Sequence, residues 1–270
     1  MEPLAGIVQN YAWGSATEIA ALRRLEPTGE PEAEFWLGAH PVASATLPER
    51  SGQTLADAIA GDPERELGAD VYAHFGPKLP YLLKLLAAAR PLSLQVHPSV
   101  DQAAAGFARE ERDGVARDAP NRSFRDPNHK PELVAALGRF EALVGFRPIA
   151  STLRFLDEID APALTPVRSL IDGGQLAAAL EHILTMSPEA AREAVDDVAA
   201  RCRDLRGSWS AQADLLVRLA QDYPGDPGVL TASLLNRVVL EPGNAIYLGK
   251  GTLHAYVSGF AVEIMANSDN

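Results

Sequence analysis

The hydrophobic pattern of this chain changes its period twice, and this change limits the fold more than any other feature. Between residues 151 and 223, apolar side chains recur at the 3.6-residue spacing of amphipathic helices. On both sides of that stretch the chain has short strand signals separated by glycine- and proline-rich turns. The pattern predicts an α+β fold that is mainly β, with residues 1–150 and 230–270 in the sheet and a helical insertion at 151–229.

Local signals place individual elements within this plan. Apolar runs or alternations bounded by turn residues predict strands at 34–38, 81–86, 91–98, 132–137, 238–240, 245–248, 253–257 and 260–265. Capping residues and helical periodicity predict helices at 15–25, 54–61, 175–186, from 188 onward and at 210–222. Residues 113–131, rich in Asp, Asn, Arg and Pro, are expected to form a loop.

Composition and charge exclude several classes of protein. The chain has 24 Lys and Arg against 36 Asp and Glu, a formal charge of 24 − 36 = −12, so it lacks the basic surplus of a nucleic-acid binder. Its 47% hydrophobic content fits a globular protein. The most apolar stretch contains Lys84 and is too short to cross a membrane, and the start of the chain does not read as a secretory leader. We expect a cytoplasmic protein whose one cysteine, Cys202, is buried in a helix.

Gln95 and His97 are the first residues that point to chemistry. The alternation in 91–98 places Ser93, Gln95 and His97 on one face of the predicted strand. Two positions apart on a strand, an amide oxygen and an imidazole can converge on one metal ion. A hydrogen-bonded surface pair is the plainer interpretation of the same two residues.

Four more ionisable residues occupy positions that need an explanation. Lys130 and Glu132 flank a proline, which biases Lys130 toward an extended conformation, so the two side chains share a face. An ion pair on an edge strand would also account for them. His254 begins a predicted strand after a glycine turn, where a structural histidine is the alternative. Glu263 lies between two apolar residues, and a carboxylate there is either paired or functional.

Six segments of the chain resemble the type I mannose-6-phosphate isomerases, in order and in spacing. They lie at residues 11–15, 34–41, 91–98, 126–132, 251–256 and 263–270. The resemblance therefore covers the whole chain. Its most specific parts are the Gln-x-His-Pro segment at 95–98 and the Asn-His-Lys-Pro-Glu segment at 128–132.

The resemblance implies a fold, a cofactor and a set of site residues. The fold would be a cupin, or jelly-roll, β-barrel with a helical insertion, and the cofactor would be one zinc ion per chain. The family motifs map the zinc ligands onto Gln95, His97, Glu132 and His254. They map the sugar-phosphate pocket and its catalytic groups onto Trp13, Lys84, Ser93, Lys130 and Glu263.

The implied reaction interconverts mannose 6-phosphate and fructose 6-phosphate through a cis-enediol. A proton then moves between C2 and C1, which requires acidification of a carbon–hydrogen bond beside a carbonyl. Two imidazoles, a neutral amide and one carboxylate leave a divalent ion with a net site charge of about +1, which suits a Lewis acid. Glu263 is the expected proton carrier, and Lys130 competes for that role or stabilises the enediolate.

The chain departs from the family pattern after its Ser-Asp-Asn segment. The family continues there through an arginine expected to contact substrate, more barrel strands and usually a second cupin domain, whereas this chain stops at Asn270. We expect a barrel that is incomplete at its C-terminal end, with open strand edges that favour self-association. A complete barrel would favour a monomer.

Two other functions fit parts of the pattern. A catalytically silent cupin would bind metal and sugar phosphate as a sensor, or as a fragment that needs a partner chain, and the missing arginine favours it. A metal cupin with other chemistry, such as dioxygenation, normally uses iron with a His-rich ligand set, so the glutamine and the paired lysines disfavour it.

Overall fold

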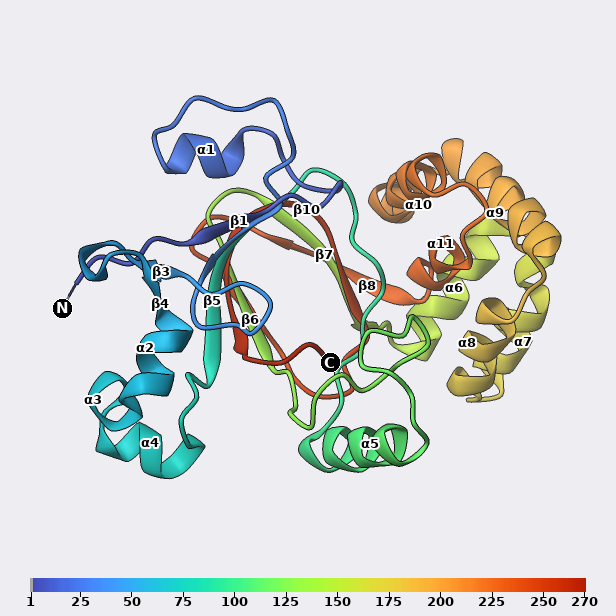
Figure 1. The fold of residues 1–270 in the computed structure, drawn as a ribbon. Coiled ribbons are helices and arrows are strands. Elements are labelled where there is room, and N and C mark those ends of the chain that lie inside the picture. Colours follow the sequence, from blue (N-terminus) through green and yellow to red (C-terminus); the bar gives the residue numbers. More distant parts are fainter. Residues whose placement is uncertain (1) are drawn as a thin grey trace.

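One curved antiparallel sheet forms the centre of the molecule, with a separate group of helices at one end (Figure 1). The computed structural model describes residues 2–270, so Met1, which opens the expected first part, lies outside the described residues. The sheet contains β1 (Ile7–Gln9), β2 (Glu34–Leu37), β5 (Tyr81–Ala88), β6 (Glu132–Ala136), β7 (Phe140–Phe146), β8 (Leu235–Leu240), β9 (Ala245–Leu248) and β10 (His254–Ala266). A small ribbon contains β3 (Thr46–Leu47) and β4 (Gln53–Thr54).

The strand order is β1-β2-β5-β10-β6-β9, and β7 pairs with both β10 and β8. Within residues 2–270 no pairing joins β9 back to β1, so the sheet is open. The expected α+β class is confirmed, with strands on both sides of a run of helices, but the fold is mixed and not mainly β because the helices contain more residues than the strands. The strands predicted around 34–38, 81–86, 132–137, 238–240 and 245–248 are present.

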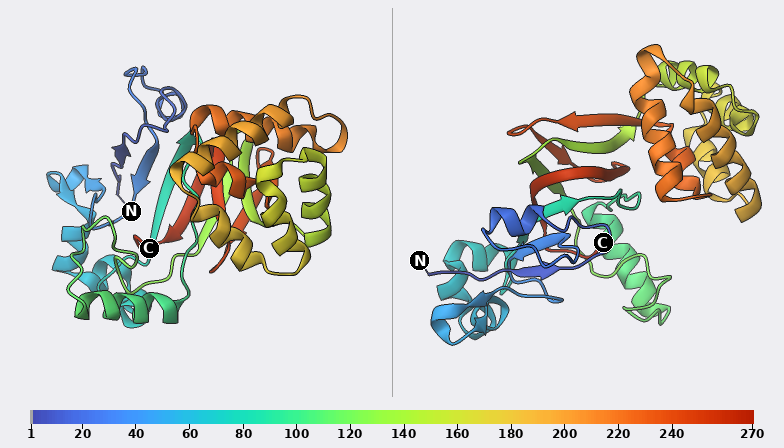
Figure 2. Two further views of the ribbon diagram at one scale, coloured as in Figure 1. Left: turned by 90° about the vertical axis from the view of Figure 1, so that its right-hand side faces the viewer. Right: turned by 90° about the horizontal axis from the view of Figure 1, so that it is seen from above.

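Residues 2–270 contain eleven α-helices in addition to the strands. Outside the insertion these are α1 (Glu18–Leu22), α2 (Leu55–Gly61), α3 (Pro63–Leu67), α4 (Ala69–Phe75) and α5 (Val100–Arg112). The insertion contains α6 (Ile149–Ile159), α7 (Thr165–Asp172), α8 (Leu176–Leu184), α9 (Pro188–Arg203), α10 (Ser210–Asp222) and α11 (Pro227–Ala232). Figure 2 shows this group standing as a bundle beside the sheet.

Hydrogen-bonded caps and an apolar core explain these helices. Thr54 and Ser187 accept the backbone N–H groups of Asp57 and Ala190, which confirms both predicted helix starts. The helix predicted at 15–25 is shorter and covers Glu18–Leu22; Ser15 lies outside it and accepts the N–H groups of Thr17 and Glu18 at its start. Cys202 is fully buried in the bundle core, where burial raises the pKa of its thiol to about 11. No helix in residues 2–270 has both the length and the apolar character needed to cross a bilayer.

Two strand predictions were wrong. Residues 91–98 form no regular strand; they run extended beside residues 251–256, with one bridge between Gln95 and His254. The segment has Pro91 at its start and Pro98 at its end, and proline cannot donate to a strand ladder. The strands expected at 253–257 and 260–265 are a single strand, β10, that bends without breaking.

The bend in β10 brings His254 and Glu263 to the same side of the sheet. Residues 254 and 263 are an odd number of positions apart, so a regular strand would point their side chains to opposite faces. The pairing of β10 with β7 shifts register between Tyr256 and Ser258. This bulge changes the alternation, and both His254 and Glu263 are buried on the inner face, with exposed fractions of 2% and 1%.

Gly259 makes this bend compatible with close packing. Its φ is +122°, and a Cβ atom there would lie 2.4 Å from the Arg139 carbonyl oxygen. Gly259→Ala is therefore expected to lower the free energy of unfolding by about 3 kcal/mol, measured by denaturant titration. Gly138→Ala is the matched control, because the nearest atom to its Cβ would be 4.0 Å away. Equal stability of the two variants would contradict this role of Gly259.

The outer face of the sheet is unusually apolar. In the cross-strand row of Ile264, Leu133 and Tyr247, the exposed fractions are 40%, 38% and 66%. Antiparallel sheets with one open face usually carry polar side chains there. Glu132 and Glu263 point to the opposite, buried face, so the site lies inside the curve of the sheet. Self-association of the chain stays a prediction.

Candidate metal centre and its pocket

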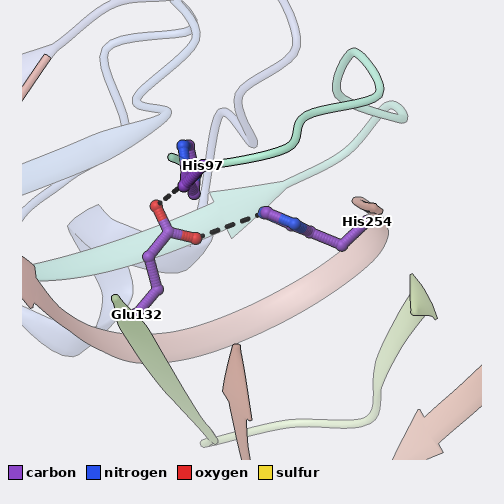
Figure 3. Close-up of side chains that lie close together, drawn as sticks. All are labelled: His97, Glu132 and His254. Carbon is purple, nitrogen blue, oxygen red and sulfur yellow. Dashed lines mark ion pairs between the residues drawn. The ribbon is translucent and has the colours of Figure 1, made fainter. Parts of the chain in front are cut away.

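Three metal-ligating side chains meet on the inner side of the sheet: His97, Glu132 and His254 (Figure 3). One ligand atom from each lies within 4.8 Å of the others, and all three residues are buried. The two carboxylate oxygens of Glu132 face one imidazole each, at 3.1 Å from His97 Nε2 and 3.3 Å from His254 Nε2. Figure 3 shows Glu132 between the two rings.

The histidine contacts fit a metal ion. His254 Nδ1 lies 2.9 Å from the Thr252 carbonyl oxygen, an arrangement in which Nδ1–H donates and Nε2 keeps its lone pair for a metal. Within residues 2–270, neither ring nitrogen of His97 has a partner with hydrogen-bond geometry. Buried polar atoms rarely lack partners. An ion between the three residues would give a partner to Nε2 of each histidine and to the carboxylate.

The electrostatics of Glu132 agree with this assignment. Burial alone would raise the pKa of Glu132, but the adjacent imidazoles of His254 and His97 and the nearby Lys130 charge hold it well below its ordinary value. The carboxylate is therefore ionised at neutral pH, which is the form that binds a metal.

Gln95, the fourth predicted ligand, is held beside His254 by the backbone. The N–H of Gln95 donates to the His254 carbonyl at 2.8 Å, and the N–H of His254 donates to the Gln95 carbonyl at 2.9 Å. Gln95 also lines the cavity that Glu132 lines. The residues present thus offer two nitrogens, a carboxylate and a neutral amide, a donor set that suits zinc.

A chain of buried polar contacts extends from the metal ligands across the sheet. The Tyr256 hydroxyl lies 2.6 Å from Glu263 Oε1 and 3.3 Å from Glu132 Oε2. Lys84 Nζ lies 2.8 Å from Glu263 Oε2 and 3.2 Å from Glu34 Oε1. Five side chains from β2, β5, β6 and β10 therefore form one connected network.

Burial and neighbouring charges together set the pKa values in this network. Burial raises the pKa of Glu263 above its ordinary value, although the Lys84 charge opposes the shift. Burial would lower the pKa of Lys84, but Glu263 and Glu34 raise it overall, so Lys84 stays charged. Burial and the Glu263 and Glu132 charges raise the pKa of Tyr256, which stays neutral. Of Glu263 and Glu132, Glu263 is therefore the carboxylate with the stronger tendency to take up a proton.

One cavity of about 700 Å³ adjoins these residues. Its lining includes seven of the nine predicted site residues: Trp13, Lys84, Ser93, Gln95, Lys130, Glu132 and Glu263. His97 and His254 adjoin it through Glu132. Lys130 is largely buried, and its Nζ lies 3.5 Å from Glu132 Oε1. The structure thus brings all nine residues to one place.

Two residues of this site, Glu34 and Tyr256, were not predicted from the sequence to take part in it. Glu34 is buried, and it accepts a hydrogen bond from Trp36 Nε1 at 2.6 Å as well as binding Lys84. Tyr256 links the metal ligand Glu132 to Glu263. The available signals were an acidic residue inside an aromatic strand segment, and a tyrosine sharing the face of His254.

Comparisons with known proteins agree with the geometry. Residues 1–149 match the family described as phosphomannose isomerase type I, catalytic domain. The chain is 39% identical over 277 residues to the mannose-6-phosphate isomerase of Escherichia coli, covering 100% of this chain and 69% of that protein. It is 31% identical over 296 residues to the human protein of that name, covering 99% of this chain and 67% of the relative.

Comparison with solved structures identifies proteins of the same name. The crystal structure of a zinc-bound mannose 6-phosphate isomerase aligns with a TM-score of 0.89 at 38% identity, covering 99% of this chain and 68% of that one. The Salmonella typhimurium isomerase, solved with fructose 6-phosphate and zinc, also aligns with a TM-score of 0.89 at 38% identity and the same coverage.

Proposed function

The chain belongs to the type I phosphomannose isomerase family, and from that premise we propose that it interconverts mannose 6-phosphate and fructose 6-phosphate with one zinc ion. One observation supports the proposal most strongly: two sets of side chains lie at the same cavity. One is the set of metal ligands His97, Glu132 and His254, and the other is the buried Lys84–Glu263 pair. Gln95 is proposed as the fourth ligand.

Zinc at this site would supply a Lewis acid that polarises the sugar carbonyl. The proton chemistry then belongs to the protein. Glu263 is proposed to take the proton from C2 and return it to C1, and its raised pKa suits a group that must accept and release a proton near neutral pH. Lys84 and Tyr256 hold the carboxylate in place through contacts of 2.8 and 2.6 Å.

The two lysines have different surroundings and are proposed to act differently. Lys84 is paired with two buried carboxylates, so most of its charge is compensated inside the protein. Its main task would be to orient Glu263. Among the acidic residues within 2–270, Lys130 contacts Glu132 alone, at 3.5 Å, and it lines the cavity. It is the better candidate for contacting anionic oxygens of the substrate, while Ser93 and Trp13 would complete the pocket wall.

A coupled assay tests the proposed function. The zinc-loaded chain should convert mannose 6-phosphate, and unphosphorylated mannose should react at least a hundredfold more slowly in kcat/KM because the Lys130 charge has no phosphate to contact. Binding of zinc and of mannose 6-phosphate without turnover would instead identify a silent sugar-phosphate binder. Equal rates with both sugars would refute the proposed substrate class.

A further inference from the structure

Residues 267–270, after β10, are bound tightly to the loop that carries Lys130. Asp126 accepts hydrogen bonds from the Ser268 hydroxyl, at 3.0 and 3.1 Å to its two oxygens, and from the Asp269 N–H at 2.7 Å. Asn270 Nδ2 donates to the carbonyls of Asp126 and Asn128 at 2.6 and 2.7 Å. Its Oδ1 accepts the N–H of Arg125 at 2.7 Å. In Figure 1 this end of the chain lies beside the loop that follows α5.

These contacts are more specific than ordinary loop packing. Ser268 is 2% exposed, and the Asp126 carboxylate accepts from it in a partly buried setting where charge-assisted hydrogen bonds are strong. Asn270 uses both its donor and its acceptor on the backbone of the loop. Residues 113–131 contain no helix or strand of their own, so the position of their last part depends on such contacts.

The loop has a second anchor just before Asp126. Glu110, on α5, accepts the N–H groups of Ser123 and Phe124 at 3.0 and 2.8 Å. Arg122 donates to the Phe124 and Val115 carbonyls. That anchor fixes the loop near α5. The contacts of Asp126 therefore serve the part of the loop that leads to the site.

Lys130 lies four residues after Asp126 and two residues before Glu132, the first residue of β6. The N–H of Ala266 donates to the Pro131 carbonyl at 3.1 Å, so the same end of β10 also holds the residue next to Lys130. We infer that Asp126, Ser268 and Asn270 form a positioning clamp that sets Lys130 at the cavity for the anionic oxygens of the substrate. This inference rests on the proposed function.

A double-mutant cycle tests whether the clamp acts through Lys130. Ser268→Ala and Asp126→Ala should each raise the KM for mannose 6-phosphate about tenfold while kcat changes less than threefold. If the clamp works by positioning Lys130, adding either change to Lys130→Ala should leave the KM within twofold of that of Lys130→Ala alone. If the KM increases of the single variants multiply in the double variants, the inference is overturned. Ser123→Ala is the matched control, because it lies in the same loop and its exposed side chain has no hydrogen bond among the described residues.

Amide hydrogen exchange provides a readout that does not depend on turnover. Asn270→Ala should speed exchange at the Arg125 amide at least tenfold and leave the Phe124 amide, held by Glu110, unchanged. Unchanged exchange at Arg125 would show that no clamp exists. If the wild-type chain binds mannose 6-phosphate without converting it, the proposed function fails. The clamp is then tested by repeating the double-mutant cycle with the dissociation constant for mannose 6-phosphate in place of KM.

Discussion

Replacing both His97 and His254 with alanine is expected to remove zinc from the chain and to lower kcat/KM for mannose 6-phosphate at least a thousandfold. The two substitutions leave Glu132 as the only remaining ligand of the buried cluster, and one carboxylate with an amide is too poor a donor set to retain zinc. A thousandfold loss corresponds to about 4 kcal/mol of transition-state stabilisation, a reasonable contribution from a Lewis acid. Metal analysis of the purified variant and the coupled assay measure the two effects together.

A matched control exists for this variant. His74 and His182 are exposed residues on α4 and α8, so changing both to alanine also removes two imidazoles but touches neither the cavity nor the network. The control should keep one zinc per chain and full activity. A variant without His97 and His254 that still turned over mannose 6-phosphate after metal removal would contradict the assigned metal centre.

Glu263→Gln is expected to lower kcat by about a hundredfold to ten-thousandfold, the range for loss of a general base, with one zinc still bound. The amide has the size of the carboxylate but takes up no proton. The substitution also removes one of the two carboxylates that contact Lys84. Steady-state kinetics and metal analysis of the same preparation check both parts of the expectation.

Glu34→Gln separates the loss of a proton acceptor from the loss of an ion pair. It removes the other carboxylate partner of Lys84 and leaves Glu263 in place. We expect a loss in kcat of less than tenfold from it. Similar losses in the two variants would show that Glu263 acts through Lys84 and carries no proton itself.

The local parts of the fold could be read from the sequence because their causes are local. The caps at Thr54 and Ser187 depend on hydrogen bonds to residues three positions away. The alternation of β2 and β6 follows from burial of one face. The course of β10 could not be read in this way, because its bulge arises from pairing with β7 on one half and with β5 and β6 on the other.

The candidate site also has some features that short sequence segments predict and others that they do not. The family motifs named the four ligands and Lys130, and each of these stands at a position that a short segment identifies. The partners of those residues come from distant parts of the chain: Glu34 is 50 residues from Lys84, and Tyr256 is 124 residues from Glu132. Contacts of this kind depend on strand order, so no short pattern in the sequence contains them.

The same limit applies to the loop at 113–131. Its composition predicted irregular structure, and the structure has no helix or strand there. The contacts of Asp126 with Ser268 join residues 142 positions apart. Each of the two segments was recognisable as a family motif, but the sequence does not show that one holds the other.

Zinc titration of the metal-free chain tests the central claim most directly. The protein is treated with a chelator, freed of it, and assayed with mannose 6-phosphate as zinc is added back in known amounts. Our account predicts no turnover without metal, a linear rise in activity, and a plateau at one equivalent of zinc per chain. Turnover by the metal-free chain, or no activity with one equivalent bound, would contradict it.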